Sequence, residues 1–157
     1  MIKAICFDFD GVIMDSMGLK LESYCFALQR FGFPQARIKE LTHVYAGLSR
    51  HKILPLMYEQ LSGHKASASV ATELLERFTE HDDRCRSLMP PVSGTLPFLK
   101  RVHSYCFTAV VTGTPQDVID KTVSFHNLSP YFDEVRGSPQ AKDEIVEDLI
   151  RRHDIPR

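Results

Sequence analysis

Two aspartates, Asp8 and Asp10, follow a short apolar run near the start of the sequence and precede Gly11. A short, nearly continuous apolar run is typical of a strand that is buried on both faces of a parallel sheet. Because alternate residues of a strand point to the same side, the two carboxylates begin on one side of the chain. Open α/β sheets bind ligands at the carboxyl ends of their strands, so this pair marks a candidate site.

Such a pair of carboxylates favours one kind of chemistry. Two neighbouring carboxylates repel each other, and a cation between them relieves the repulsion. Mg²⁺ prefers hard oxygen ligands and commonly accompanies phosphate groups. One carboxylate can then attack phosphorus, and the other can protonate the leaving oxygen. The alternative interpretation of the same residues is a β-hairpin turn at Asp10-Gly11.

The segment FDFDGVIMDS, residues 7–16, resembles the first motif of the haloacid dehalogenase (HAD) superfamily in its phosphatase branch. Every position of that motif is filled, which disfavours the hairpin. The resemblance implies a Rossmann-like α/β core with a parallel sheet and an inserted helical cap. It also implies a Mg²⁺-dependent phosphohydrolase in which Asp8 becomes an aspartyl-phosphate and Asp10 is the general acid and base. Asp8 and Asp10 would both bind Mg²⁺.

A second segment, VVTGTP at residues 110–115, ends another apolar run. Thr112 supplies a hydroxyl there, Gly113 lets backbone N–H groups approach an anion, and the next helix presents its amino end. Threonine before glycine is also common in turns and caps. Beside the first motif, the segment resembles the second HAD motif, whose Ser or Thr hydrogen-bonds the transferred phosphoryl group.

Lys142 opens the last expected helix, after the segment GSPQA at residues 137–141. A lysine near a helix amino end opposes the helix dipole, and an anion held nearby would explain its position. The alternative is a solvated surface lysine. The segment resembles the third HAD motif, whose lysine neutralises the charge of the phosphorylated aspartate.

The fourth HAD motif, a group of aspartates that completes the Mg²⁺ site, has no counterpart before the sequence ends at Arg157. In the family, the strand before that motif lies beside the first strand. We therefore expect the Asp8 strand to be a sheet edge, with either poor solubility or self-association through that edge. We also expect weak or absent phosphatase activity in these 157 residues.

The elements that position these residues alternate between strand and helix in residues 1–15 and 90–157, which predicts a parallel α/β core. Strands are expected at residues 106–111 and 131–135, and helices at 116–126 and 142–152. Residues 16–89 carry only helical periodicity and are too long for a normal crossover. We interpret them as an inserted helical cap, with simple helical packing on one core as the alternative.

Other functions remain open at this stage. A sugar phosphomutase of the same superfamily is one alternative function. Those mutases carry a histidine in the first hinge region, and this sequence has Lys20 near that place. Arg50, in the expected cap, is a candidate ligand for a substrate carboxylate or phosphate, or an exposed arginine at a helix start. A phospho-acceptor receiver domain is disfavoured by the long helical insert. A fragment without catalytic activity, acting by binding or not at all, is a third hypothesis.

The composition sets wider limits. The sequence has 157 residues, enough for one domain of ordinary size, and with 43% hydrophobic and 25% charged residues its composition is that of an ordinary globular protein. A net charge of −1 gives no reason to expect nucleic acid or an anionic membrane as a partner. Cys6, Cys25, Cys85 and Cys106 show no CxxC spacing, so we expect reduced thiols, mostly buried, in a cytoplasmic protein. The expected partner is a small phosphorylated metabolite.

Overall fold

A parallel three-stranded sheet carries the candidate motifs in the computed structural model, which describes residues 2–155. The strands are β1 (Ala4–Phe7), β2 (Phe107–Pro115) and β3 (Glu134–Ser138), in the order β1-β2-β3. Both pairs are parallel, and Phe7 lies opposite Val110 in the register of β1 with β2. The predicted α/β class is therefore confirmed. Among the described residues β1 pairs only with β2, which leaves it at the sheet edge.

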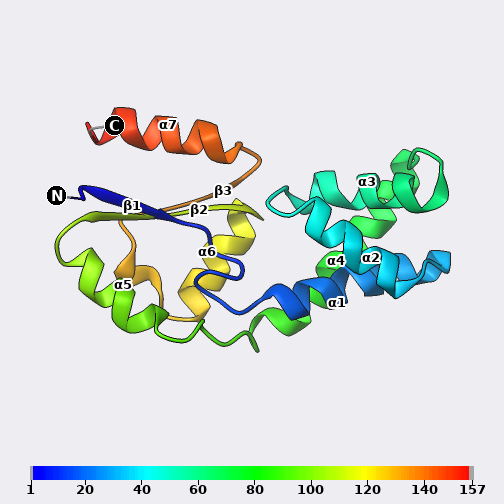
Figure 1. The fold of residues 1–157 in the computed structure, drawn as a ribbon, viewed down its shortest axis with the longest axis horizontal. Helices are drawn as coiled ribbons and strands as arrows, with labels where there is room; N and C mark the ends of the chain where they lie inside the picture. The colour runs from blue at the N-terminus through cyan, green and yellow to red at the C-terminus, as the bar shows by residue number, and fades with distance from the viewer. Residues whose placement is uncertain (1, 156–157) are drawn as a thin grey trace. The chain divides into compact units, whose positions relative to one another are not determined.

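Helices pack on both faces of this sheet (Figure 1). They are α5 (Thr95–His103), α6 (Gln116–Phe125) and α7 (Lys142–Arg152), with a short 3-10 helix, η2, at Ser129–Tyr131. On the α7 side, Ile145 and Leu149 pack against Ala109 and Val111 of β2. On the other side, the Phe7 ring makes an edge contact with Phe98 of α5. The site residues therefore rest on a sheet with a core on each face.

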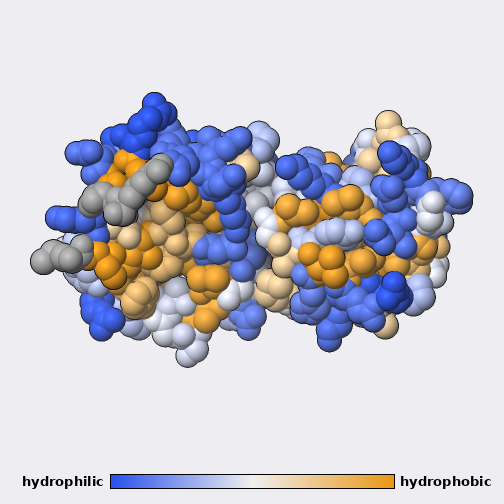
Figure 2. Space-filling model, turned by 45° about the horizontal axis from the view of Figure 1, so that its top comes forward, coloured by the Kyte–Doolittle hydropathy of each residue, from blue (hydrophilic) through white to orange (hydrophobic). Residues whose placement is uncertain are grey.

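The expectation that β1 is buried on both faces is wrong. Cys6 is exposed, although it was predicted to lie in a buried strand. In the register Cys6 lies opposite Ala109, so its side chain points to the α7 side, where α7 packs over β2 and β3. Ile2, just before β1, is also 64% exposed. The edge strand is thus covered on one face and accessible on the other. Apolar residues are visible on the surface of the part of the molecule that holds the sheet (Figure 2).

Both later strands differ from their expected ranges. β2 begins after Cys106 and continues through the second motif to Pro115. β3 begins at Glu134, whereas the sequence predicted residues 131–135, because Tyr131 belongs to the 3-10 helix η2 and Asp133 bonds to Thr108 through both its backbone and its side chain. The Asp133 carboxylate accepts the Thr108 N–H at 2.7 Å, and the Tyr131 carbonyl accepts the Thr108 hydroxyl at 2.9 Å. The pairing of β2 with β3 therefore starts at Ala109 and Glu134, one residue after Thr108 and Asp133.

The chain divides into two compact units, Met1–Asp15 with Pro90–Arg157, and Ser16–Met89. Residue 1 and residues 156–157, at the ends of the expected core, lie outside the described residues. At the boundary the two connecting segments pair: the Asp15 N–H donates to the Pro90 carbonyl at 2.9 Å, and the Val92 N–H to the Ile13 carbonyl at 3.0 Å. The core unit thus holds both ends of the insert side by side.

The second unit is helical. It consists of α1 (Met17–Leu28), a 3-10 helix η1 (Gln29–Phe31), α2 (Gln35–Val44), α3 (Arg50–Ser62) and α4 (Ala68–Arg86). It has a core of its own, in which the rings of Tyr24 and Phe78 lie 4.7 Å apart. No helix among residues 2–155 is long and apolar enough to cross a membrane.

Candidate active site

The turn after β1 places the two aspartates. The Phe9 side chain is fully buried, and its carbonyl accepts the N–H groups of Ile13 at 2.9 Å and Met14 at 3.1 Å. Gly11 has a φ of 76°, a left-handed conformation that glycine adopts without strain. This tight turn anchors Phe9 in the core, so Asp8 and Asp10 flank a fixed point of the backbone.

Asp8 is paired with Lys142. The Lys142 Nζ donates to Asp8 Oδ2 at 2.7 Å, and the Phe9 N–H donates to Asp8 Oδ1 at 2.8 Å. The side chain of Asp8 is 39% exposed and that of Lys142 is 34% exposed, so a solute can reach both. A carboxylate that is hydrogen-bonded to an ammonium group is held in one orientation, as a nucleophile needs.

The fold brings Lys142 to this place through β3. The strand ends at Ser138, and α7 begins at Lys142 after a loop, with Ile145 and Leu149 anchoring the helix on the sheet. The amino end of α7 therefore lies at the carboxyl end of the sheet, and its dipole adds positive character there. The pairing explains why a lysine stands in the first turn of a helix.

Asp10 has a partner that the sequence did not single out. The Thr114 hydroxyl donates to Asp10 Oδ2 at 2.9 Å. Thr114 is 3% exposed, and its backbone N–H donates to the Thr112 hydroxyl oxygen at 3.2 Å. A signal was present in the segment Thr-Gly-Thr, because residues two apart on a strand share one side. The family motif itself points only to Thr112.

Thr112 and Gly113 lie within β2 itself, beyond the expected end of the strand. Thr112 is 1% exposed and Gly113 is half-buried. Thr112 is linked to Asp10 through Thr114, which brings the first and second motifs into one bonded group. That Thr112 and Gly113 contact the same anion as Asp8 stays a prediction.

The donor set at this edge fits a magnesium ion. Carboxylates are the hard oxygen ligands that Mg²⁺ prefers, and this ion commonly keeps several waters beside one or two of them. Asp8 and Asp10 are both partly exposed and follow the same strand, so both can offer an oxygen atom. Within residues 2–155 no group of three or more His, Cys, Asp and Glu side chains is arranged to hold a metal.

Arg50, a sequence-predicted substrate ligand, lies at the start of α3 in the helical unit. It is not the exposed arginine that the alternative interpretation expected, because its side chain is only 4% exposed. The guanidinium donates to Asp82 Oδ2 at 3.0 Å and lies 4.7 Å from the centre of the Phe78 ring. Arg86 pairs with the same carboxylate. A substrate contact by Arg50 stays a prediction, and its observed contacts are internal.

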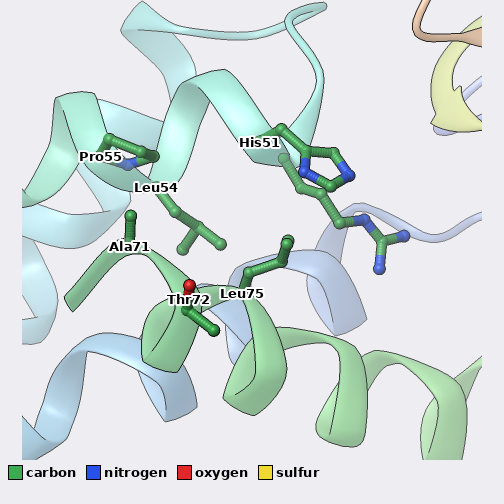
Figure 3. Close-up of a pocket in the computed structure, with 7 residues that line it drawn as sticks. His51, Leu54, Pro55, Ala71, Thr72 and Leu75 are labelled. Atoms are coloured by element: carbon green, nitrogen blue, oxygen red, sulfur yellow. The ribbon is translucent and has the colours of Figure 1, made fainter. Parts of the chain in front are cut away.

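A small pocket also lies in the helical unit, between α3 and α4 (Figure 3). Its volume is about 150 Å³. The residues that line it are Arg50, His51, Leu54, Pro55, Ala71, Thr72 and Leu75. Most of these residues are apolar, and neither Asp8 nor Asp10 lines the pocket. The residues of the first and third motifs therefore remain the better candidate for a catalytic site.

Comparisons with known proteins identify relatives of this chain. The chain is 26% identical over 142 residues to a phosphoglycolate phosphatase of Aliivibrio fischeri, a match that covers 87% of this chain and 61% of the relative. It is 27% identical over 150 residues to a phosphorylated carbohydrates phosphatase of Thermotoga maritima, covering 90% of this chain and 64% of the relative. The chain thus spans less than two thirds of the length of these relatives.

A solved structure, described as a predicted phosphoglycolate phosphatase from Haemophilus somnus, superposes with a TM-score of 0.81. The match covers 98% of this chain and 72% of the other, at 16% identity, so it supports the fold alone. The family model described as haloacid dehalogenase-like hydrolase matches residues 5–156. This range contains both aspartates, Thr112 and Lys142, and the chain therefore belongs to the haloacid dehalogenase-like hydrolases.

Proposed function

We propose that the protein is a Mg²⁺-dependent phosphatase that hydrolyses a small phosphorylated metabolite through an aspartyl-phosphate on Asp8. The observation that carries the proposal is the contact between Lys142 and Asp8, which pairs the expected nucleophile with a cation. The lysine offsets charge that accumulates when an anionic phosphate approaches an anionic carboxylate. Family membership and the names of the two relatives support the same activity.

The roles of the residues follow from the chemistry of phosphate esters. An Asp8 oxygen attacks phosphorus and forms an acyl phosphate, while the bond from phosphorus to the ester oxygen breaks. Asp10 gives its proton to that leaving oxygen, then takes a proton from the water that releases phosphate and restores Asp8. Asp8, through its carboxylate, and Asp10, through its backbone carbonyl oxygen, would hold Mg²⁺, which would supply positive charge against the transferred group. Lys142, Thr112 and the Gly113 backbone would contact the phosphoryl oxygens.

The substrate class is proposed from the relatives. Their names specify phosphoglycolate and phosphorylated carbohydrates, which are small anionic molecules. We propose that the helical unit, residues 16–89, acts as the cap that gives specificity. Within it, Arg50 is the proposed contact to a carboxylate or second phosphate, and such a contact would have to coexist with its ion pair to Asp82.

The test is hydrolysis of 4-nitrophenyl phosphate by the purified chain, with Mg²⁺ and then with a chelator. We expect weak turnover that Mg²⁺ restores after chelation and that Asp8→Asn abolishes. Asp83→Asn, at an exposed aspartate of α4 outside the motifs, is the matched control and should retain activity. Turnover that Asp8→Asn leaves unchanged would contradict the proposal. Conversion of a sugar phosphate to its isomer without release of phosphate would instead indicate a mutase.

A further inference from the structure

We propose that Thr114 is a positioning residue for Asp10, whose hydroxyl holds the Asp10 carboxylate in the orientation needed to protonate the leaving group. This inference rests on the proposed function. It concerns a residue of the second motif segment to which the family resemblance gives no role, and it starts from the 2.9 Å hydrogen bond between Thr114 Oγ1 and Asp10 Oδ2.

Asp10 needs such support because of where it lies. It follows the edge strand β1 and stands in a turn, so the sheet ladder does not determine its side-chain torsions. A partly exposed aspartate has two rotatable side-chain bonds, and a general acid must place its proton within hydrogen-bonding distance of the leaving oxygen. A donor that is itself immobile can select one orientation.

Thr114 is immobile for three reasons. It is 3% exposed, and its backbone N–H donates to the Thr112 hydroxyl oxygen at 3.2 Å. Its carbonyl oxygen packs so closely against Gly137 of β3 that a side-chain carbon on Gly137 would overlap it. The neighbouring strand therefore fixes the backbone from which the hydroxyl projects.

The side chain of Gln116 closes this arrangement. Its Oε1 accepts the Gly137 N–H at 2.6 Å, and its Nε2 donates to the Val135 carbonyl at 3.0 Å. Gln116 is only two residues beyond Thr114, so it clamps the end of β2 to β3 beside the threonine. Thr114 is thus set by two strands, whereas Asp10 lies in a turn. The hydrogen bond from the Thr114 hydroxyl therefore restricts the orientation of the Asp10 carboxylate.

The contact also assigns the two oxygen atoms of Asp10. Because Oδ2 accepts the Thr114 hydroxyl, Oδ1 is the oxygen that carries the transferable proton. When the bond from phosphorus to the leaving oxygen breaks, its electron pair stays on that oxygen, which takes the proton from Oδ1. Losing the Thr114 hydroxyl should therefore slow reactions that need this proton and spare those that do not.

The experiment compares two substrates. 4-Nitrophenyl phosphate has a leaving group that departs without a proton, whereas glycerol 2-phosphate has an alkoxide that needs one. Thr114→Val should reduce kcat at least about tenfold more on glycerol 2-phosphate than on 4-nitrophenyl phosphate. Thr114→Ser, which keeps the hydroxyl, should restore most of the loss.

Thr122→Val is the matched control. Thr122 is a buried threonine of the same unit whose hydroxyl donates to the Val118 carbonyl, so its loss should affect both substrates equally. Equal losses on both substrates in Thr114→Val, or a serine variant as poor as the valine variant, would overturn the positioning role.

A second measurement separates this inference from the proposed function. Three-bond NMR couplings about the Cα–Cβ bond of Asp10 report its rotamer in the isotopically labelled chain, whether or not the chain hydrolyses phosphate esters. A single rotamer is expected in the parent chain and averaged couplings in Thr114→Val. An unchanged single rotamer in the valine variant would refute the inference, whereas missing phosphatase activity alone would count against the proposed function.

Discussion

Lys142 donates a 2.7 Å hydrogen bond from Nζ to Asp8 Oδ2 across a separation of 134 residues. The lysine is the first residue of α7, and the aspartate directly follows β1. The contact joins an expected nucleophile to the cation that would balance the phosphate bound to it. Its consequences can be tested apart from the fold, because both side chains are partly exposed.

Lys142→Met should lower kcat for 4-nitrophenyl phosphate about a hundredfold or more, because a preorganised cation beside the transferred group is lost. Unfolding free energy should change by less than about 1 kcal/mol, as for other partly exposed ion pairs. Lys100→Met, at an exposed lysine of α5, serves as the control and should leave kcat within about twofold. Steady-state kinetics and urea unfolding measure the two quantities. A variant at position 142 with near-normal kcat would exclude a catalytic role for this lysine.

Asp82→Asn should destabilise the helical unit by about 2–4 kcal/mol, because Arg50 and Arg86 would lose the buried carboxylate that both contact. Thermal unfolding followed by circular dichroism gives the change. Glu80→Gln provides the comparison: Glu80 also pairs with an arginine of α4, but its side chain is 52% exposed. That variant should lose no more than about 0.5 kcal/mol. Equal effects in the two variants would show that the buried position of Asp82 is unimportant.

Glu134 should make the stability of the α7 contact depend on pH. Hydrogen bonds from Arg152, with further contributions from His153 and Arg136, lower the pKa of Glu134 from 4.5 to about 2. Because the pKa is lower in the folded state, the stabilisation is complete above the unfolded value of 4.5. It is lost as the pH falls through the folded value of about 2.

Glu134→Gln should therefore reduce the free energy of unfolding by about 1–2 kcal/mol near neutral pH, and the difference should shrink as the pH falls below the ordinary value for a glutamate. Urea unfolding at a series of pH values measures this dependence. Glu76→Gln, at an exposed residue of α4, serves as the control. A loss in Glu134→Gln that stays constant between about pH 7 and pH 3 would contradict the assignment.

Gly137→Ala should destabilise the core unit by about 1–3 kcal/mol, since the added carbon would overlap the Thr114 carbonyl oxygen and lie 3.0 Å from the backbone of Gln116. Gly18→Ala is a useful contrast. Gly18 lies in α1, has no atom within 4 Å of the added carbon, and should be neutral or slightly stabilising. Thermal unfolding compares the two, and a tolerated alanine at position 137 would mean that β2 and β3 can separate locally.

Much of the core follows from patterns that are local in the sequence. Periodicity located the helices to within a few residues, and the apolar runs located the first two strands. The pairing of Asp8 with Lys142 could be expected because each follows a strand, and the carboxyl ends of parallel strands meet at one edge. The family resemblance added the roles of both residues, which spacing alone does not provide.

Other features depend on which residues the fold brings together from distant places. The exposure of Cys6 results from α7 packing over β2 and β3, which no property of the strand itself reveals. Asp82 lies in a run of charged residues that looks solvated, yet it is buried with Arg50, 32 residues away. Glu134 and Asp148 likewise enter an ion-pair network with Arg136 and Arg152, which come from β3 and the end of α7.

Thr114 shows both what local sequence patterns reveal and what only the tertiary structure decides. Its position two residues after Thr112 on a strand is readable in the sequence, and so is the side to which it points. Its partner is not, because the choice between Asp8 and Asp10 depends on how the chain turns after Phe9. Hydrogen bonds select partners by distances of a few tenths of an ångström. Periodicity describes directions along one element, and only packing between elements sets distances of that kind.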